Sequence, residues 1–147
     1  MMKSKHFLIA GGMISTLISI MHVLLVLKPA LFVYISAGQE SMLAQLAVQG
    51  SSPTTIATVA LTLIFAVWAI YAFSGAGLIR PLPLLRAALI LISVIYLFRA
   101  LAIFTEINMV MNQGYPFRFV VFSAISLIAG LFYLFGVLIQ RSDSTQS

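Results

Sequence analysis

One permanently charged side chain lies inside an apolar stretch of this sequence. Arg99 falls within residues 83–104, which are mostly apolar and numerous enough to cross a bilayer as one helix. A guanidinium in the middle of such a helix costs roughly 2.5–3.5 kcal/mol on insertion scales, so it needs partners that stabilise it. An arginine in this setting attracts anions and donates hydrogen bonds, and its surroundings are therefore the best lead to function.

Two carboxylates outside the C-terminal tail are available to Arg99, namely Glu40 and Glu106. Glu106 lies nearly on the same helix face but about 10 Å further along the axis, which is long for a direct pair. Glu40 lies in a long first loop. We predict that this loop folds back onto the helices, so that Glu40 pairs with Arg99 and His22 lies beside them. Alternatively, Arg99 extends toward the headgroups and buries only its aliphatic stem.

Further polar side chains fall in the same half of the membrane. Tyr96, Arg99 and Glu106 share one helix face by their spacing. Hydroxyl side chains recur at helical spacing in the second and fourth apolar stretches, where they let helices approach closely and hydrogen-bond across, as packing devices or as a binding surface. The candidate ligand-binding residues are Arg99, His22, Glu40, Glu106, Tyr96, Thr58, Thr62, Ser123 and Ser126.

The sequence carries no catalytic or metal-binding signature. Cysteine is absent, which excludes disulfides, thiol catalysis and thiolate metal sites on this chain. The two histidines, His6 and His22, fall near opposite membrane boundaries, unlike the axial ligands of a haem. Clustered His, Asp and Glu side chains are also missing. We assign no catalytic residue, metal ligand or cofactor; acid–base chemistry on a lipid by His22 is the third-ranked alternative.

Four apolar stretches must position these residues. The chain has 147 residues, of which 62% are hydrophobic and 7% charged, whereas soluble domains carry about 25% charged residues. We predict an all-α polytopic membrane protein, an antiparallel bundle of four transmembrane helices over residues 7–27, 56–78, 84–107 and 119–140. Residues 1–141 form one domain and residues 142–147 a polar tail. The first stretch is too long for a signal peptide.

The connections between the predicted helices differ in length. Residues 74–83 make a tight turn, because glycine ends one helix and proline opens the next. Residues 28–53 form the longer first outer loop. Within it, residues 41–50 have apolar side chains at helical spacing, which predicts a short interfacial helix.

The basic residues indicate the orientation of the chain. Five lie on one side of the predicted membrane and two on the other: Lys3, Lys5, Arg80, Arg86 and Arg141 against Lys28 and Arg118. The excess of positive charge predicts that both termini are cytoplasmic. These residues are scattered and form no basic run, so the net charge of +5 does not indicate a nucleic-acid partner.

Several short segments carry a resemblance to a known family. They are His22 followed by Pro29, the Ser-Ala-Gly-Gln-Glu segment at 36–40, the Tyr-Ala-Phe-Ser-Gly-Ala-Gly segment at 71–77, and Leu-Leu-Arg at 84–86 leading to Tyr-Leu-Phe-Arg at 96–99. Over about half its length the chain resembles small bacterial four-helix membrane proteins, broadly DoxX-like. The resemblance implies an inner-membrane protein, in some cases associated with quinone- or thiol-linked redox systems. The absence of cysteine departs from a thiol mechanism.

The size of the chain is also similar to that of small multidrug transporters. Those proteins rely on a membrane-embedded glutamate in their first helix, and residues 7–27 contain no acid. This departure argues against proton-coupled export of cations. From the sequence as a whole we expect a multi-pass protein of the bacterial inner membrane without catalytic activity of its own. Its outer-half polar pocket is expected to bind a lipid-like, quinone-like or anionic amphiphile. Alternatives are an accessory subunit of a larger membrane complex and a small transporter that works as a homo-oligomer.

Overall fold

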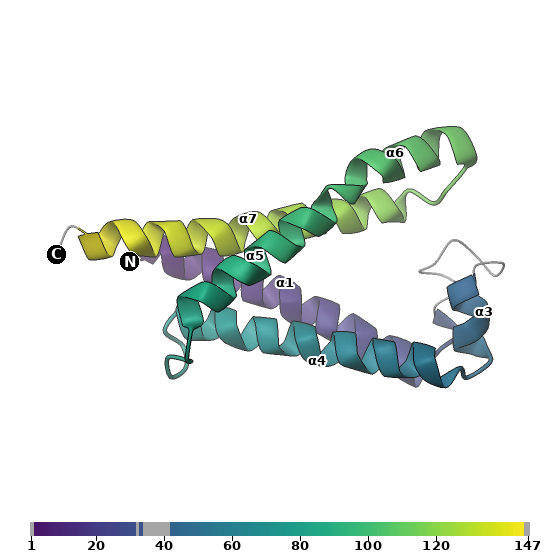
Figure 1. Cartoon of the computed structure of the whole chain (residues 1–147), viewed down its shortest axis with the longest axis horizontal. Helices are drawn as coiled ribbons and strands as arrows, with labels where there is room; N and C mark the ends of the chain where they lie inside the picture. Colours follow the sequence, from purple (N-terminus) through teal and green to yellow (C-terminus); the bar gives the residue numbers. More distant parts are fainter. Residues whose placement is uncertain (1, 32, 34–41, 146–147) are drawn as a thin grey trace. The chain divides into compact units, whose positions relative to one another are not determined.

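The computed structural model describes residues 2–31, 33 and 42–145 of the chain. These residues form helices joined by turns, and none of them lies in a strand. The helices are α1 (Met2–Leu27), α3 (Met42–Val48), α4 (Ser52–Gly75), α5 (Leu85–Ala100), α6 (Ala102–Gln113) and α7 (Arg118–Thr145) (Figure 1). The predicted all-α fold is confirmed, including a short helix in the first long loop.

Four helical stretches of the described chain are long and apolar enough to cross a membrane. They are Lys3–Leu27, Ser52–Gly75, Leu85–Gln113 and Arg118–Gln140, the third of which combines α5 and α6. Large apolar side chains such as Leu63 and Phe98 are exposed on these helices. A helix satisfies its own backbone hydrogen bonds, so such a surface suits lipid rather than water. The chain is a multi-pass membrane protein.

The third span is longer than the sequence suggested. The prediction ended this helix at Ile107, because polar side chains such as Asn108 and Asn112 follow. In the structure α6 continues to Gln113 and ends at Gly114, which has a left-handed φ of 68° and whose backbone N–H donates to the carbonyl of Met109. Glycine adopts this conformation without steric cost, so Gly114 is the residue that ends the helix.

The chain falls into two compact units, Met1–Ser15 with Val67–Ser147, and Thr16–Ala66. In the first unit the start of α1 packs closely against α4, α5 and α7. A Cβ atom added at Gly75 of α4 would lie 2.8 Å from Leu89 of α5 and 2.9 Å from Leu8 of α1. One added at Gly136 of α7 would lie 2.5 Å from Leu8. The glycines therefore let four helix backbones approach one another, as in other membrane bundles.

A chain of buried hydroxyl groups also joins these four helices. The Ser15 hydroxyl on α1 lies 2.9 Å from the Tyr96 hydroxyl on α5 and 2.8 Å from the Tyr133 hydroxyl on α7. Tyr133 donates to the backbone carbonyl of Trp68 on α4 at 3.0 Å. Each hydroxyl has one proton, so Ser15 must donate to Tyr133 and accept from Tyr96. The polar groups in the middle of this unit are thus satisfied by one another.

The second unit contains the end of α1, α3 and the first part of α4. The Ser19 hydroxyl of α1 donates to the carbonyl of Thr62 in α4 at 2.9 Å. The backbone N–H of Ser51 donates to the carbonyl of Leu46 at 2.9 Å, and Gly50 between them has a left-handed φ of 71°. This glycine turn connects α3 directly to α4.

Candidate functional site

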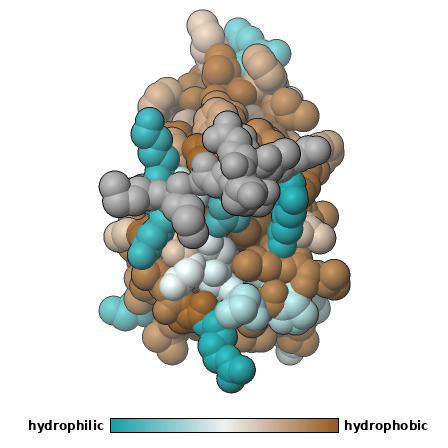
Figure 2. All heavy atoms as spheres, turned by 90° about the vertical axis from the view of Figure 1, so that its left-hand side faces the viewer, coloured by the Kyte–Doolittle hydropathy of each residue, from teal (hydrophilic) through white to brown (hydrophobic). Residues whose placement is uncertain are grey.

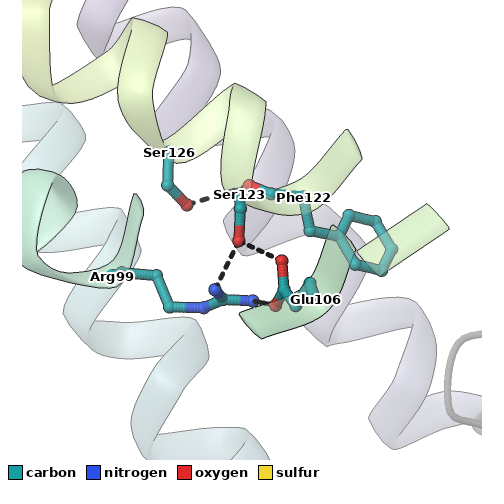
Figure 3. A network of polar contacts seen from close by, with 5 residues as sticks. All are labelled: Arg99, Glu106, Phe122, Ser123 and Ser126. Carbon is teal, nitrogen blue, oxygen red and sulfur yellow. Dashed lines mark hydrogen bonds and ion pairs between the residues drawn. The ribbon is translucent and has the colours of Figure 1, made fainter. Parts of the chain in front are cut away.

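Arg99 lies in a three-residue polar cluster of the first unit (Figure 3). Its Nη2 atom is 3.1 Å from Oε1 of Glu106, and its Nη1 atom donates to the Ser123 hydroxyl at 2.7 Å. The Ser123 hydroxyl in turn donates to Oε2 of Glu106. Each member therefore touches the other two, and the cluster joins α5, α6 and α7.

The prediction that Glu106 is too distant for a direct pair with Arg99 was wrong. The separation of about 10 Å applies to the helix axis, whereas the two long side chains extend toward each other. Side chains on a helix lean toward its N-terminus, so Glu106 leans back in the direction of Arg99. The helix is also interrupted between them, where Leu101 separates α5 from α6 and its N–H donates to the Phe98 carbonyl at 3.2 Å, a 3₁₀-type bond.

The three members of the cluster differ in exposure. The Arg99 side chain is 44% exposed, the Glu106 side chain is 13% exposed, and Ser123 is fully buried. Arginine has five N–H donors, and the described residues accept from two of them, through Nη1 and Nη2. The cationic partner is thus the accessible one, and it retains donors for a further acceptor.

The guanidinium group of Arg99 lies near one end of α7. Its partner Ser123 is five residues after Arg118, the first residue of α7. At 1.5 Å per residue this places the group roughly 7 Å into the helix. The contact with Ser123 therefore places the guanidinium group near the end of α7 that begins at Arg118. The alternative that Arg99 extends to the headgroups stays a prediction.

Three predicted hydroxyl residues bond to their own helices. Ser126 donates to the carbonyl of Phe122 at 3.0 Å, as Figure 3 shows beside the cluster. Thr58 donates to the carbonyl of Thr54 at 2.8 Å, and Thr62 to that of Thr58 at 2.9 Å. The expected bonds from these side chains to neighbouring helices are therefore wrong, because the carbonyl four residues earlier is always within reach of a helical Ser or Thr.

Tyr96 contributes to the fold and not to the Arg99 cluster. It is 3% exposed, its hydroxyl bonds to Ser15, and its ring lies 5.0 Å from that of Trp68 and 5.8 Å from that of Tyr133. The spacing of three residues between Tyr96 and Arg99 placed both on one face of the helix, but they belong to different polar clusters.

His22 belongs to the second unit, as do Thr58 and Thr62. Its Nδ1 atom lies 2.8 Å from the carbonyl oxygen of Ile18, to which it donates, and its ring lies 5.3 Å from that of Phe65. Glu40 lies outside the described residues. Of the nine predicted site residues, the structure brings together Arg99, Glu106 and Ser123. The pairing of Arg99 with Glu40 beside His22 stays a prediction.

The buried hydroxyl chain of Ser15, Tyr96 and Tyr133 could not be predicted as a unit from the sequence. A signal was present, because Ser15 is a hydroxyl residue in the middle of an apolar helix and is now found fully buried. Its two tyrosine partners lie 81 and 118 residues away in the chain. Only the packing of α1 against α5 and α7 identifies them.

No match to this chain was found among models of protein families, curated proteins or solved structures. The function must therefore be argued from the site itself. Within the described residues, no group of three or more His, Cys, Asp and Glu side chains is placed to hold a metal ion. The cluster of Arg99, Glu106 and Ser123 can recognise charge and donate hydrogen bonds.

Proposed function

We propose that the cluster of Arg99, Glu106 and Ser123 binds the polar head of a membrane amphiphile. An anionic lipid head or a quinone ring supplies the acceptor oxygens that a guanidinium recognises. The observation that carries the proposal is the difference in exposure within the ion pair. Arg99 is 44% exposed, whereas its carboxylate partner is 13% exposed, so a ligand reaches the cation first.

The position of the guanidinium group suits such a ligand. It lies roughly 7 Å from the start of α7, close to the depth at which headgroups meet acyl chains. An amphiphile can place its head there while its tail stays among the exposed apolar side chains beside Arg99, such as Phe98 and Leu101. The low polarity of this region strengthens each hydrogen bond made to Arg99.

Glu106 limits the strength of binding, because it already neutralises Arg99. A head that carries negative charge competes with Glu106 for the guanidinium, whereas a quinone oxygen accepts one of the N–H groups that Glu106 leaves unused. Glu106 thereby lowers the affinity of the site for an anionic head, so that binding is reversible. Removal of the Glu106 charge is expected to raise the affinity for an anionic head and to leave that for a quinone nearly unchanged.

The proposal also includes the membrane and the leaflet in which the site lies. With both termini in the cytoplasm, as the basic residues predict, the cluster faces the outer leaflet. The resemblance to DoxX-like proteins favours a bacterial inner membrane and a quinone among the candidate ligands. The accessory-subunit and transporter alternatives stay predictions.

Native mass spectrometry tests the proposal with three probes, namely phosphatidylglycerol, phosphatidylcholine and a short-chain ubiquinone. Wild type is expected to retain the quinone, or one phosphatidylglycerol molecule that Arg99→Met lacks, and Glu106→Gln to retain that phosphatidylglycerol in a larger fraction of molecules. The matched control is Ser126→Ala, one turn from Ser123, which should bind as wild type does. Equal retention by wild type and Arg99→Met would show that the cluster has only a structural role.

A further inference from the structure

A second charged surface lies at the opposite end of the first unit. Four basic side chains are exposed there: Lys3 and Lys5 in the first turns of α1, Arg80 in the connection between α4 and α5, and Arg86 at the start of α5. We call this surface the basic end face. It is distinct from the cluster around Arg99, which lies at the other end of α5.

Packing places these segments together. Leu8, one turn after Lys5, and Leu89, one turn after Arg86, both lie against Gly75. The Gln140 side chain of α7 donates to the carbonyl of Gly75 at 2.6 Å. The first turns of α1, the α4–α5 connection and the last turns of α7 therefore share one end of the unit, as Figure 1 also shows.

The charge of the basic end face is not neutralised by the part of the protein that the structure describes. Among the described side chains the single carboxylate is that of Glu106, and it pairs with Arg99. Each of the four basic side chains is exposed. Their combined charge of about four units attracts anions strongly at short range and weakly beyond a Debye length of roughly 8–10 Å.

Exposed apolar side chains accompany the cations. Leu78, Ile79 and Leu84 lie in the α4–α5 connection next to Arg80 and Arg86, and Leu84 is 82% exposed. Figure 2, which looks onto this end, shows hydrophilic and hydrophobic side chains side by side. Three large apolar side chains gathered at one place suit an interface better than bulk water. A membrane interface accommodates both kinds, with apolar groups in the acyl region and cations at the phosphates.

We propose that the basic end face binds anionic phospholipid headgroups in the leaflet that surrounds it. A lysine or arginine near an anionic membrane contributes about fivefold in affinity. Four such side chains around one end of the bundle therefore select anionic lipids over zwitterionic ones. The bound lipids would fix the depth of the α4–α5 connection in the membrane.

The test is native mass spectrometry of protein released from nanodiscs with equal parts of phosphatidylglycerol and phosphatidylcholine. Wild type is expected to retain phosphatidylglycerol preferentially. The preference should fall by up to several hundredfold, the product of about fivefold for each side chain, in the variant with Lys3, Lys5, Arg80 and Arg86 all changed to Gln. High salt should weaken it in wild type. No preference in wild type, or the same preference in the variant, would overturn the proposal.

Two controls make the result specific. Lys28→Gln removes a basic residue after the other end of α1, and Arg99→Met removes the cation of the other site; both should keep the preference. Loss of the preference in Arg99→Met alone would instead assign it to the Arg99 cluster and overturn this proposal. If the fourfold variant does not fold, the pairs Lys3→Gln with Lys5→Gln and Arg80→Gln with Arg86→Gln provide the same comparison.

Discussion

Arg99 and Glu106 form an ion pair of 3.1 Å across the junction at which α5 ends and α6 begins. The pair thus connects two helices of one membrane span, and Ser123 extends the connection to α7. No residue of α6 is buried. The polar cluster is therefore a principal attachment of α6 to the rest of the first unit, and the proposed ligand would bind at that attachment.

The two members of the ion pair should differ in their effect on stability. Arg99→Met leaves the largely buried Glu106 carboxylate without its cation, which should cost about 3 kcal/mol. Glu106→Gln leaves a half-exposed cation that retains Ser123, and a cost of about 1–2 kcal/mol is expected. The free energy of unfolding in detergent micelles measures both. The double variant should cost less than the two single changes together; strict additivity would mean that the pair is not coupled.

Ser123 and Ser126 provide a matched comparison on one helix. Ser123→Ala removes the hydroxyl that accepts from Arg99 and donates to Glu106, so a loss of about 1–2 kcal/mol is expected. Ser126→Ala removes a hydroxyl that bonds only to its own helix, and the loss should stay below about 0.5 kcal/mol. Unfolding of both variants under one set of conditions gives the difference. Similar losses would contradict the role assigned to Ser123.

The buried hydroxyl chain should contribute to the stability of the first unit. Tyr133→Phe preserves the ring but removes the link between Ser15 and the Trp68 carbonyl, which should cost about 1–2 kcal/mol. Tyr71→Phe is the control, because its hydroxyl makes one bond of 3.4 Å, to the carbonyl of Pro83. Thermal unfolding in neutral lipid nanodiscs distinguishes them. If Tyr71→Phe is destabilised as much as Tyr133→Phe, the effect is not specific to the buried hydroxyl chain.

The close contact between α1 and α7 can be tested at Gly136. A Cβ atom there would lie 2.5 Å from Leu8, so Gly136→Ala should destabilise the protein by about 1–3 kcal/mol. Leu8→Ala alone should cost about 2–5 kcal/mol, because it leaves a cavity. In the double variant the new methyl group occupies part of that cavity. Its measured loss should therefore be smaller than the sum of the two single losses, and a loss equal to that sum would argue against the contact.

The orientation of the chain can be tested with introduced cysteines, because the sequence contains none. Gln113→Cys lies at the end of α6 and Leu78→Cys in the α4–α5 connection, and both positions are exposed. In intact cells a membrane-impermeant maleimide should label position 113 and should reach position 78 only after permeabilisation. The reverse pattern would place the termini outside and would move the Arg99 cluster to the cytoplasmic leaflet.

Local features of the sequence were sufficient to predict the helices. Each apolar stretch is long enough to span a bilayer by itself, so the spans follow from composition without knowledge of their neighbours. The turn at residues 74–83 follows in the same way from glycine and proline. The end of the third span was misplaced, because polar residues such as Asn108 do not terminate a helix whose backbone bonds remain satisfied until Gly114.

The candidate site could be predicted only in part. Arg99, Glu106 and Ser123 were each identified by type and depth, since a charge in an apolar helix needs a partner. Their pairing was missed, because axial rise describes backbones and not the reach of long side chains. The sequence also could not distinguish Ser123 from Ser126, which look alike at helical spacing but face different acceptors.

The sequence by itself therefore determined the membrane class, the four spans and the position of Arg99 inside the third of them. These properties depend on how single residues and short segments partition between water and lipid. The tertiary structure decided which polar groups meet: Arg99 with Glu106 and Ser123, and Ser15 with Tyr96 and Tyr133. Such contacts depend on the rotation and spacing of packed helices, which glycines such as Gly136 set and which no single segment encodes.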